Sequence, residues 1–155
     1  MKKIMIPTSV LILAAGSAIF WMYPGKNRPE YAVSAFGNPV MEIRIADDVF
    51  MAEAVSSAEK RMLGLSGREE MCHSCAMLFI FPEPARYSFW MKDMKFNLDI
   101  VWISGASVKS IEKNVPFVEG EREVVRPDAP IDKVLEFNAG VSDEIGLKIG
   151  DEIHF

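Results

Sequence analysis

Short stretches in which hydrophobic and polar residues alternate recur from residue 40 to the end of the chain. This period of two is typical of β-strands, whose side chains point to opposite faces in turn. In the stretch 40–45, Met41, Ile43 and Ile45 alternate with charged residues, which predicts a half-buried strand. Further strands are predicted at 50–55, 77–81, 86–92, 98–103, 108–115, 134–139 and 151–155. Many short strands favour a predominantly β, α+β fold, either a small distorted barrel or a sandwich.

Four of these predicted strands have features that indicate their place or orientation in the sheet. Residues 77–81 are apolar on both faces, which predicts a central strand that ends at Pro82-Glu83-Pro84, because proline has no N–H to donate. The stretches 98–103 and 108–115 flank a tight turn at Gly105 and predict a hairpin. The stretch 86–92 would place Tyr87, Phe89 and Met91 on one face and Arg86, Ser88, Trp90 and Lys92 on the other.

One or two short helices are expected between the strands. Ser56 and Glu59 have the spacing of a capping box, which predicts a helix that runs to Leu63 and stops at Gly64. Residues 142–145 are long enough for one helical turn. Residues 116–130 are acidic and contain prolines, which predicts a long loop.

The N-terminal segment has a different pattern. Residues 4–23 contain no charged side chain, follow Lys2 and Lys3, and are about as long as a helix that crosses a bilayer. The segment is either a signal peptide cleaved near Gly16 and Ala18 or an uncleaved anchor. We favour the anchor, because cleavage after Ala18 would leave residues 19–23 as an exposed apolar end.

This pattern divides the chain into a leader at 1–23, a linker at 24–39 and one domain at 40–155. The anchor predicts a single-pass protein of the cell membrane whose domain lies outside the cytoplasm. If the leader is cleaved, the protein is instead secreted or periplasmic.

Charge narrows the choice of partner. Lys2, Lys3, Lys26, Arg28 and Glu30 precede residue 31, so residues 31–155 keep 13 of the 17 basic and 21 of the 22 acidic side chains, a net charge of −8. Nucleic acid is a poor partner for such a domain, because phosphate binding needs clustered positive charge.

Several separated motifs occur together in the domain. They are the apolar run 76–81, Phe89-Trp90-Met91-Lys92, Leu98-Asp99-Ile100, residues 134–140 and 146–151, and the earlier segment 59–68. In this order they resemble the DUF192 family, also called UPF0127, from about residue 41 to residue 155. The resemblance implies a compact, mainly β domain, commonly behind an export signal, with no established activity or catalytic residues.

The chain departs from the family pattern at three places. Ala76 stands where glycine is usual, and Asn97 stands where a proline usually precedes Leu-Asp. The third departure is the pair Cys72 and Cys75, which many members lack.

The cysteine pair has several possible roles. An exported domain meets an oxidising compartment, where Cys72 and Cys75 can close as a local disulfide. A thiol redox site would need its first cysteine at a helix N-terminus, whereas this pair leads into a strand. For a metal, the two thiolates and His73 leave a ligand position open, and a c-type haem needs histidine at position 76, which is Ala76. We therefore predict no metal and no cofactor.

Asp99 is the unusual residue of an otherwise apolar strand, and a buried carboxylate must be paired or hydrogen-bonded. It could be structural, held by a cation such as Lys92 or by backbone amides. In the functional interpretation, Asp99 orients a ligand hydroxyl while Trp90 stacks on the apolar face of the ligand.

Glu136 and Asn138 share one face of their predicted strand and could simply be its solvent side. Alternatively, they join Trp90, Lys92 and Asp99 around one pocket, with Arg68 as a further candidate. Such a set would suit a polar or carbohydrate-like ligand.

The leading hypothesis is a membrane-tethered binding or accessory module outside the cytoplasm that recognises a small polar ligand or an envelope protein. One alternative is an enzyme of the hydrolase type that uses Asp99 and Glu136 as acid and base. Another is a thiol redox protein that uses Cys72 and Cys75.

Overall fold

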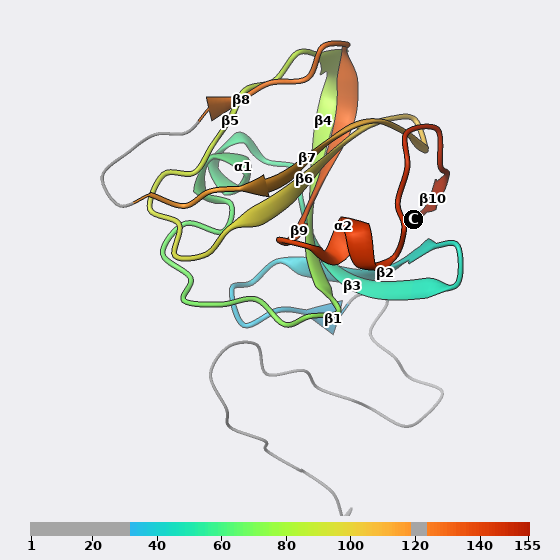
Figure 1. The fold of residues 1–155 in the computed structure, drawn as a ribbon. Helices are drawn as coiled ribbons and strands as arrows, with labels where there is room; N and C mark the ends of the chain where they lie inside the picture. Colours follow the sequence, from blue (N-terminus) through green and yellow to red (C-terminus); the bar gives the residue numbers. More distant parts are fainter. Residues whose placement is uncertain (1–31, 119–123) are drawn as a thin grey trace, which may run out of the picture.

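The computed structural model describes residues 32–118 and 124–155, which form one main sheet, a two-stranded ribbon and two short helices (Figure 1). The leader predicted at 1–23 lies outside the described residues, as does the first half of the linker, residues 24–31. The strands are β1 (Ala32–Val33), β2 (Pro39–Ile45), β3 (Asp48–Val55), β4 (Cys75–Ala85), β5 (Phe89–Trp90), β6 (Leu98–Ser104), β7 (Ser107–Val115), β8 (Val124–Val125), β9 (Ile131–Asn138) and β10 (Ile153–His154). The helices are α1 (Ala58–Leu63) and α2 (Val141–Glu144).

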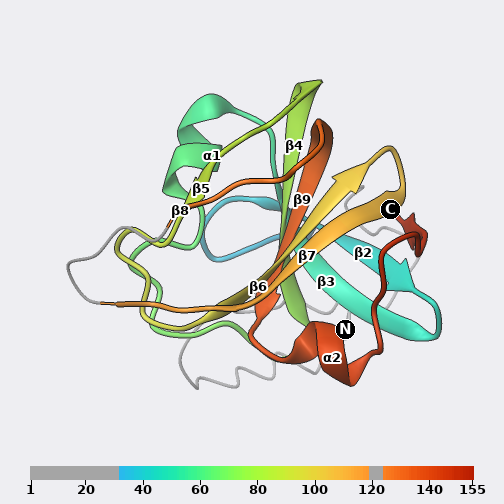
Figure 2. The same cartoon turned by 45° about the horizontal axis from the view of Figure 1, so that its top comes forward.

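The main sheet has the strand order β1-β2-β3-β4-β9-β6-β7, and β10 pairs with β2 off this path. The β3–β4 pair is parallel, and α1 lies in the crossover between these two strands. The other pairs are antiparallel, including the predicted β6–β7 hairpin. Figures 1 and 2 show β4 and β9 side by side, with β2 and β3 running across their direction. The sheet is therefore strongly twisted.

The central strands β4, β9 and β6 bury both of their faces. On one face, Leu78, Val101 and Leu135 belong to a cluster that includes side chains of β2, β3, α2 and β10. On the other face, Met77, Trp102 and Val134 belong to a cluster with Leu65, Met91 and Met94. This double burial is why these strands are apolar on both faces instead of alternating.

The prediction of a predominantly β domain with short helices is confirmed, but the strands do not form a closed barrel. The C-terminal segment contacts both β2 and β7, which lie near opposite ends of the sheet, but it does not close the gap between them. Ile153 pairs with Ile45 of β2, and the neighbouring Glu152 makes an isolated bridge to Ser107 of β7. Within the described chain, no continuous ladder joins β7 to β2.

Three local predictions need correction. The N-cap of α1 is Ser57, whose side chain accepts a hydrogen bond from the Lys60 N–H, so Ser56 does not cap the helix. The prolines at 82 and 84 do not end β4, because they fall where its ladder with β9 is interrupted between Ile80 and Ala85. The strand predicted at 86–92 shrinks to β5, which pairs with β8 inside the expected loop.

Candidate functional site

A cavity of about 250 Å³ lies between α1, β4, the segment that carries β5, and β9. Its wall is mostly apolar and aromatic. It is lined by Ala58, Arg61, Met62, Leu63, Gly64, Leu65, Ser66, Phe79, Phe81, Tyr87, Ser88, Phe89, Trp90, Met94 and Glu136. The volume is just below the range of about 300–1,000 Å³ that holds drug-sized ligands, so the cavity suits a compact molecule.

Glu136 contributes the one carboxylate to this lining. It lies on β9 between Met77 of β4 and Ile100 of β6, and its neighbours across the strands are therefore apolar. The side chain is buried, with 6% of the residue exposed, and accepts no hydrogen bond from the described residues. Burial raises the pKa of Glu136 to about 8, although the nearby charge of Arg68 acts in the opposite direction.

The other polar side chains of the lining already have partners. The Arg61 guanidinium donates to the carbonyl oxygens of Ser56 and Ile80. Ser66 donates to the Lys92 carbonyl, and the Tyr87 hydroxyl donates to the Glu83 carbonyl. The Ser88 hydroxyl oxygen accepts from Arg126. In the described lining, the groups without a hydrogen bond are thus the Glu136 carboxyl group and the indole N–H of the partly exposed Trp90, and only Glu136 can carry a charge.

Aromatic rings pack in a continuous group along the same wall. The rings of Phe79 and Phe89 meet edge to face with centroids 4.9 Å apart, and Phe81 stacks on Tyr87 at 3.7 Å. Trp90 lines the cavity but remains 44% exposed. Of the six predicted ligand-binding residues, Trp90 and Glu136 are therefore brought to one cavity.

Asp99 faces the opposite side of the sheet. In the β6–β9 register, Glu136 is paired with Ile100, whereas Asp99 is paired with Phe137, one position further along. Because neighbouring positions on a strand point to opposite faces, the two carboxylates cannot share a cleft. Asp99 is fully buried away from the cavity.

The Asp99 carboxylate is held by donors from two other segments. Oδ1 accepts from the Asn114 N–H at 2.8 Å. Oδ2 accepts from the N–H groups of Gly140 and Ser142 at 3.0 and 2.9 Å, and from the Ser142 hydroxyl at 2.6 Å. Asp99 thus joins β6 to β7 and to the start of α2, which is the structural role held by backbone amides that the sequence left open.

Asn138 and Lys92 also lie outside the cavity lining. The Asn138 side-chain amide donates to the carbonyl oxygens of Met71 and Cys72 and so holds the segment before β4. Lys92 is exposed and pairs with its neighbour Asp93, not with Asp99. Neither residue is placed to contact a ligand in the cavity.

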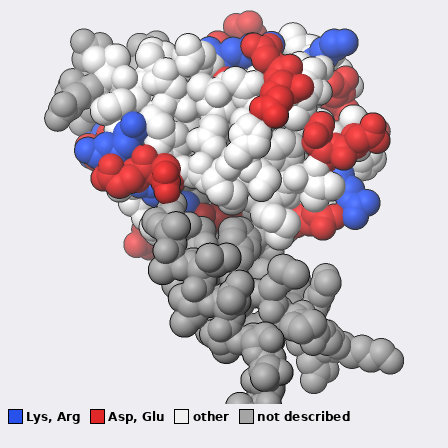
Figure 3. All heavy atoms as spheres, turned by 60° about the horizontal axis from the view of Figure 1, so that its bottom comes forward, with Lys and Arg blue, Asp and Glu red and all other residues white. Residues whose placement is uncertain are grey.

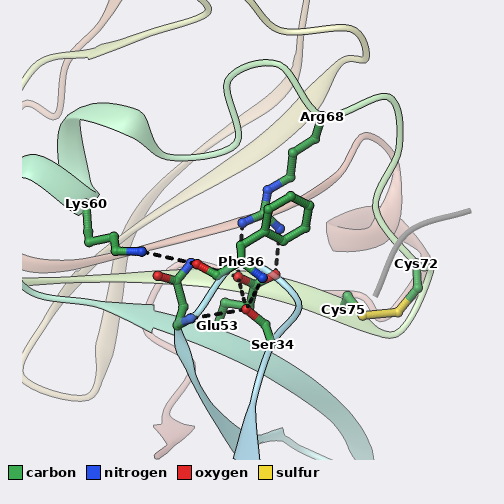
Figure 4. A network of polar contacts seen from close by, with 8 residues as sticks. Ser34, Phe36, Glu53, Lys60, Arg68, Cys72 and Cys75 are labelled. Carbon is green, nitrogen blue, oxygen red and sulfur yellow. Dashed lines mark hydrogen bonds and ion pairs between the residues drawn. A yellow bond between two sulfur atoms is a disulfide. The ribbon is translucent and has the colours of Figure 1, made fainter. Parts of the chain in front are cut away.

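Arg68 belongs to a separate polar network (Figure 4). Its guanidinium forms a bidentate ion pair with Glu53 of β3 and lies 3.7 Å from the ring centroid of Phe36. Ser34 and Asn38 also donate to Glu53. Burial would raise the pKa of Glu53, but these hydrogen bonds and the charge of Arg68 outweigh it and lower the pKa.

Cys72 and Cys75 form the predicted disulfide, which closes the turn that leads into β4. Its position beside the Arg68 network is seen in Figure 4. Among the described residues, no group of three His, Cys, Asp or Glu side chains is placed to hold a metal ion.

Sequence reasoning missed most of the cavity wall. It placed α1 correctly but gave no reason to bring Arg61 or Leu65 against β4 and β9, because that contact depends on the parallel crossover. It also missed Glu53 as the partner of Arg68. A sequence signal for Glu53 existed, since it is the one charged residue in the apolar stretch 49–55.

The described residues contain no helix that is long and apolar enough to span a bilayer. The predicted anchor at 4–23 lies outside them.

Comparisons with known proteins give a family but no activity. The sequence profile of DUF192, described as "Uncharacterized ACR", matches residues 41–155. No curated protein matches the chain.

Two crystal structures are similar to the domain. A protein of unknown function from Novosphingobium aromaticivorans DSM 12444 superposes with a TM-score of 0.75 at 24% identity, over 85% of this chain and 100% of that one. A Sinorhizobium meliloti 1021 protein, named "putative transcription regulator", gives a TM-score of 0.65 at 28% identity, over 72% and 88% of the two chains. At 24% identity, the first of these likenesses shows the fold alone.

Proposed function

Because the chain belongs to the uncharacterised DUF192 family, we propose its function from the cavity: it is a binding or accessory module that takes a small ligand against Glu136. Residues 4–23 would tether this module to the membrane with its domain outside the cytoplasm. Glu136 carries the proposal, since a buried carboxylate without a hydrogen-bond partner is costly to keep and its place in a cavity suggests a use.

The structure alters the kind of ligand that the sequence suggested. Five aromatic side chains and several aliphatic ones line the cavity, so a carbohydrate with hydroxyl groups on all sides would find few partners. A compact molecule with an apolar body and one polar group fits better. Trp90 would cover the apolar body, and Glu136 would meet the polar group.

The alternative functions lose their geometric support. An acid–base pair of Asp99 and Glu136 is wrong, because the two side chains face opposite sides of the sheet. In the thiol redox alternative, Cys72 and Cys75 lead into β4 and not into a helix, so no helix N-terminus is present there to lower a thiol pKa.

A nucleic-acid partner, which the name of the S. meliloti protein would suggest, has little support in the charge distribution. The surface in Figure 3 presents scattered acidic and basic side chains toward its margins and an uncharged centre, with no continuous basic patch on that face. The net charge of −8 over residues 31–155 also argues against a nucleic-acid partner, because the phosphate groups would be repelled.

The test is a fragment screen by saturation-transfer NMR on the full chain in detergent micelles, with protein-free micelles as the blank. We expect fragments with one aromatic ring and one polar group to bind. Binding should weaken several-fold in Glu136→Gln and Trp90→Ala. It should persist in the matched controls Glu152→Gln and Phe155→Ala, which change an exposed carboxylate and an exposed ring outside the cavity lining.

If no fragment binds, or if all four variants bind as the parent does, the cavity is not a ligand site. An envelope partner recovered equally by the parent and by Glu136→Gln would also count against the cavity.

A further inference from the structure

We infer that the cavity selects an organic ammonium ion, a protonated amine attached to a small apolar or aromatic body. This inference rests on the proposed function and names its ligand class. It follows from the juxtaposition of one unpaired carboxylate with a wall of aromatic rings.

The polar groups of the lining favour a ligand that donates hydrogen bonds. Three of the described donor side chains, Arg61, Ser66 and Tyr87, already donate to backbone carbonyl oxygens. The Trp90 indole N–H and the Ser88 hydroxyl hydrogen have no acceptor among the described residues, but neither group carries a charge that would favour an anionic ligand. The remaining open acceptor is the Glu136 carboxylate. An ammonium group supplies N–H donors and a charge opposite to that of the ionised Glu136 carboxylate, whereas a carboxylate or phosphate ligand would be repelled by the ionised form and would have to bind its protonated form.

The aromatic wall favours a cation for an independent reason. Ring faces carry negative electrostatic potential and attract cations that lie over them. The protein already uses this attraction at the edge of the cavity, where the Arg61 guanidinium lies 4.9 Å from the ring centroid of Phe81. Trp90, the best ring type for such a contact, lines the same cavity and is partly exposed.

Three positive side chains near the cavity act against a cation, but each is engaged. Arg126, which is exposed, donates to the Ser88 hydroxyl oxygen. The charge of Arg68 is compensated by its bidentate ion pair with Glu53. Arg61 is held by the Ser56 and Ile80 carbonyl oxygens and by the Phe81 ring. Around them, the net charge of −8 over residues 31–155 raises the local concentration of cations.

Binding of an ammonium ion would displace the proton from the Glu136 carboxyl group. In the empty cavity at neutral pH, Glu136 is mostly protonated because burial raises its pKa to about 8. When an ammonium ion enters, the carboxyl group releases its proton to solvent and the carboxylate accepts the N–H hydrogen bonds. The apparent affinity for an ammonium ligand should therefore rise with pH up to about 8.

The test compares three probes of one shape: benzylamine, benzyl alcohol and benzoate. Dissociation constants are measured on the full chain in micelles by NMR titration at pH 6.5 and 8.5, with protein-free micelles as the blank. We expect benzylamine to bind roughly tenfold more tightly than the other two at pH 8.5, with a smaller preference at pH 6.5. The preference should disappear in Glu136→Gln and persist in Glu152→Gln.

The remaining outcomes separate this inference from the proposed function. If the three probes bind equally, or if the alcohol or benzoate binds best and more tightly at pH 6.5, the cavity is a ligand site but does not select ammonium ions. If benzylamine keeps its preference in Glu136→Gln, another charge attracts it and the inference is also wrong. If no probe binds and the fragment screen is empty, the proposed function fails as well.

Discussion

Glu136 and Asp99 are carboxylates on neighbouring strands that meet opposite environments. Asp99 is buried with four donors around it, whereas Glu136 is buried without one and faces a cavity. A satisfied carboxylate stabilises the fold, and an unsatisfied one costs stability that a ligand can recover. This contrast makes Glu136 the candidate for function and Asp99 the candidate for structure.

The raised pKa of Glu136 predicts how stability changes with pH. The pKa of Glu136 is about 8 in the folded protein and 4.5 for the free side chain. Between pH 4.5 and pH 8 the folded state therefore binds more protons than the unfolded state. The stability contributed by the neutral form is fully present below pH 4.5 and is lost as the pH rises to about 8. In Glu136→Gln this loss is removed, so the stability of the variant relative to the parent should rise by on the order of 3 kcal/mol from pH 5 to pH 8.

Urea denaturation of the full chain at several pH values measures this difference, with Glu152→Gln as the control for a carboxylate change on the surface. Parallel pH profiles for the parent and Glu136→Gln would show that Glu136 is ionised in the folded protein throughout this range.

Asp99→Asn should destabilise the fold strongly while leaving the cavity intact. An amide can offer only one acceptor oxygen, and its NH₂ group would then face either the Asn114 N–H or the donors of Gly140 and Ser142. Losing at least one hydrogen bond to a buried charged group and placing two donors together should cost about 2–4 kcal/mol in the free energy of unfolding. Chemical denaturation measures it, with Asp128→Asn at an exposed position as the control. A cost below that of the control variant would contradict the structural role of Asp99.

At the scale of elements, the cavity depends on how α1 is ended and held. Gly64 follows the helix with a φ of 51°, and its N–H donates to the Lys60 carbonyl. A Cβ atom at this position would lie 3.4 Å from the Phe79 ring, which forms part of the cavity wall. The end of α1 therefore affects the cavity directly, because the absence of a side chain at Gly64 leaves room for the Phe79 ring in the cavity wall.

Gly64→Ala should destabilise the domain and shift the Phe79 ring. Gly64 has a ψ of −131° together with its positive φ, a backbone conformation open essentially to glycine, so an alanine there costs about 1–3 kcal/mol, and the close contact with Phe79 adds to this. Gly67→Ala is a matched control, because Gly67 has a φ of 75° and a Cβ atom there would meet no other atom within 4 Å. Denaturation should show a larger loss for Gly64→Ala, and NMR should show Phe79 shifts in that variant alone. If the two variants lose equal stability and the Phe79 signals are unchanged, the residue that ends α1 does not influence the cavity wall.

At the scale of the whole molecule, the predictions concern where the domain works. A leader at 4–23 that stays attached would keep the protein with the membrane, and the Cys72–Cys75 disulfide suits an oxidising compartment outside the cytoplasm. We expect the full chain to fractionate with membranes and to resist extraction at high salt, and its domain to be cleaved by protease added outside the cytoplasmic membrane.

A variant with charged residues at Leu11 and Leu13 should lose the membrane association, because charges in the middle of a spanning helix oppose insertion. A full-length chain found in the soluble cytoplasmic fraction would contradict the proposed location, and a shortened chain in the soluble exported fraction would show that the leader is a cleaved signal peptide.

Patterns along the chain were enough to predict most of the strands, the hairpin around Gly105, the helix that stops at Gly64 and the disulfide of Cys72 and Cys75. These features depend on local alternation, turn chemistry and short spacing, all of which can be read from neighbouring residues. The family motifs also indicated membership in DUF192.

Which polar residues share a site became known only from the folded arrangement. Register sets the face of every side chain on a strand, so one position separates Glu136 in the cavity from Asp99 on the other side of the sheet. Arg61, Phe79 and Glu136 meet because α1 crosses between parallel strands, a long-range arrangement that no local pattern encodes. A site assembled from separate strands depends on their pairing, and that pairing is a property of the folded chain.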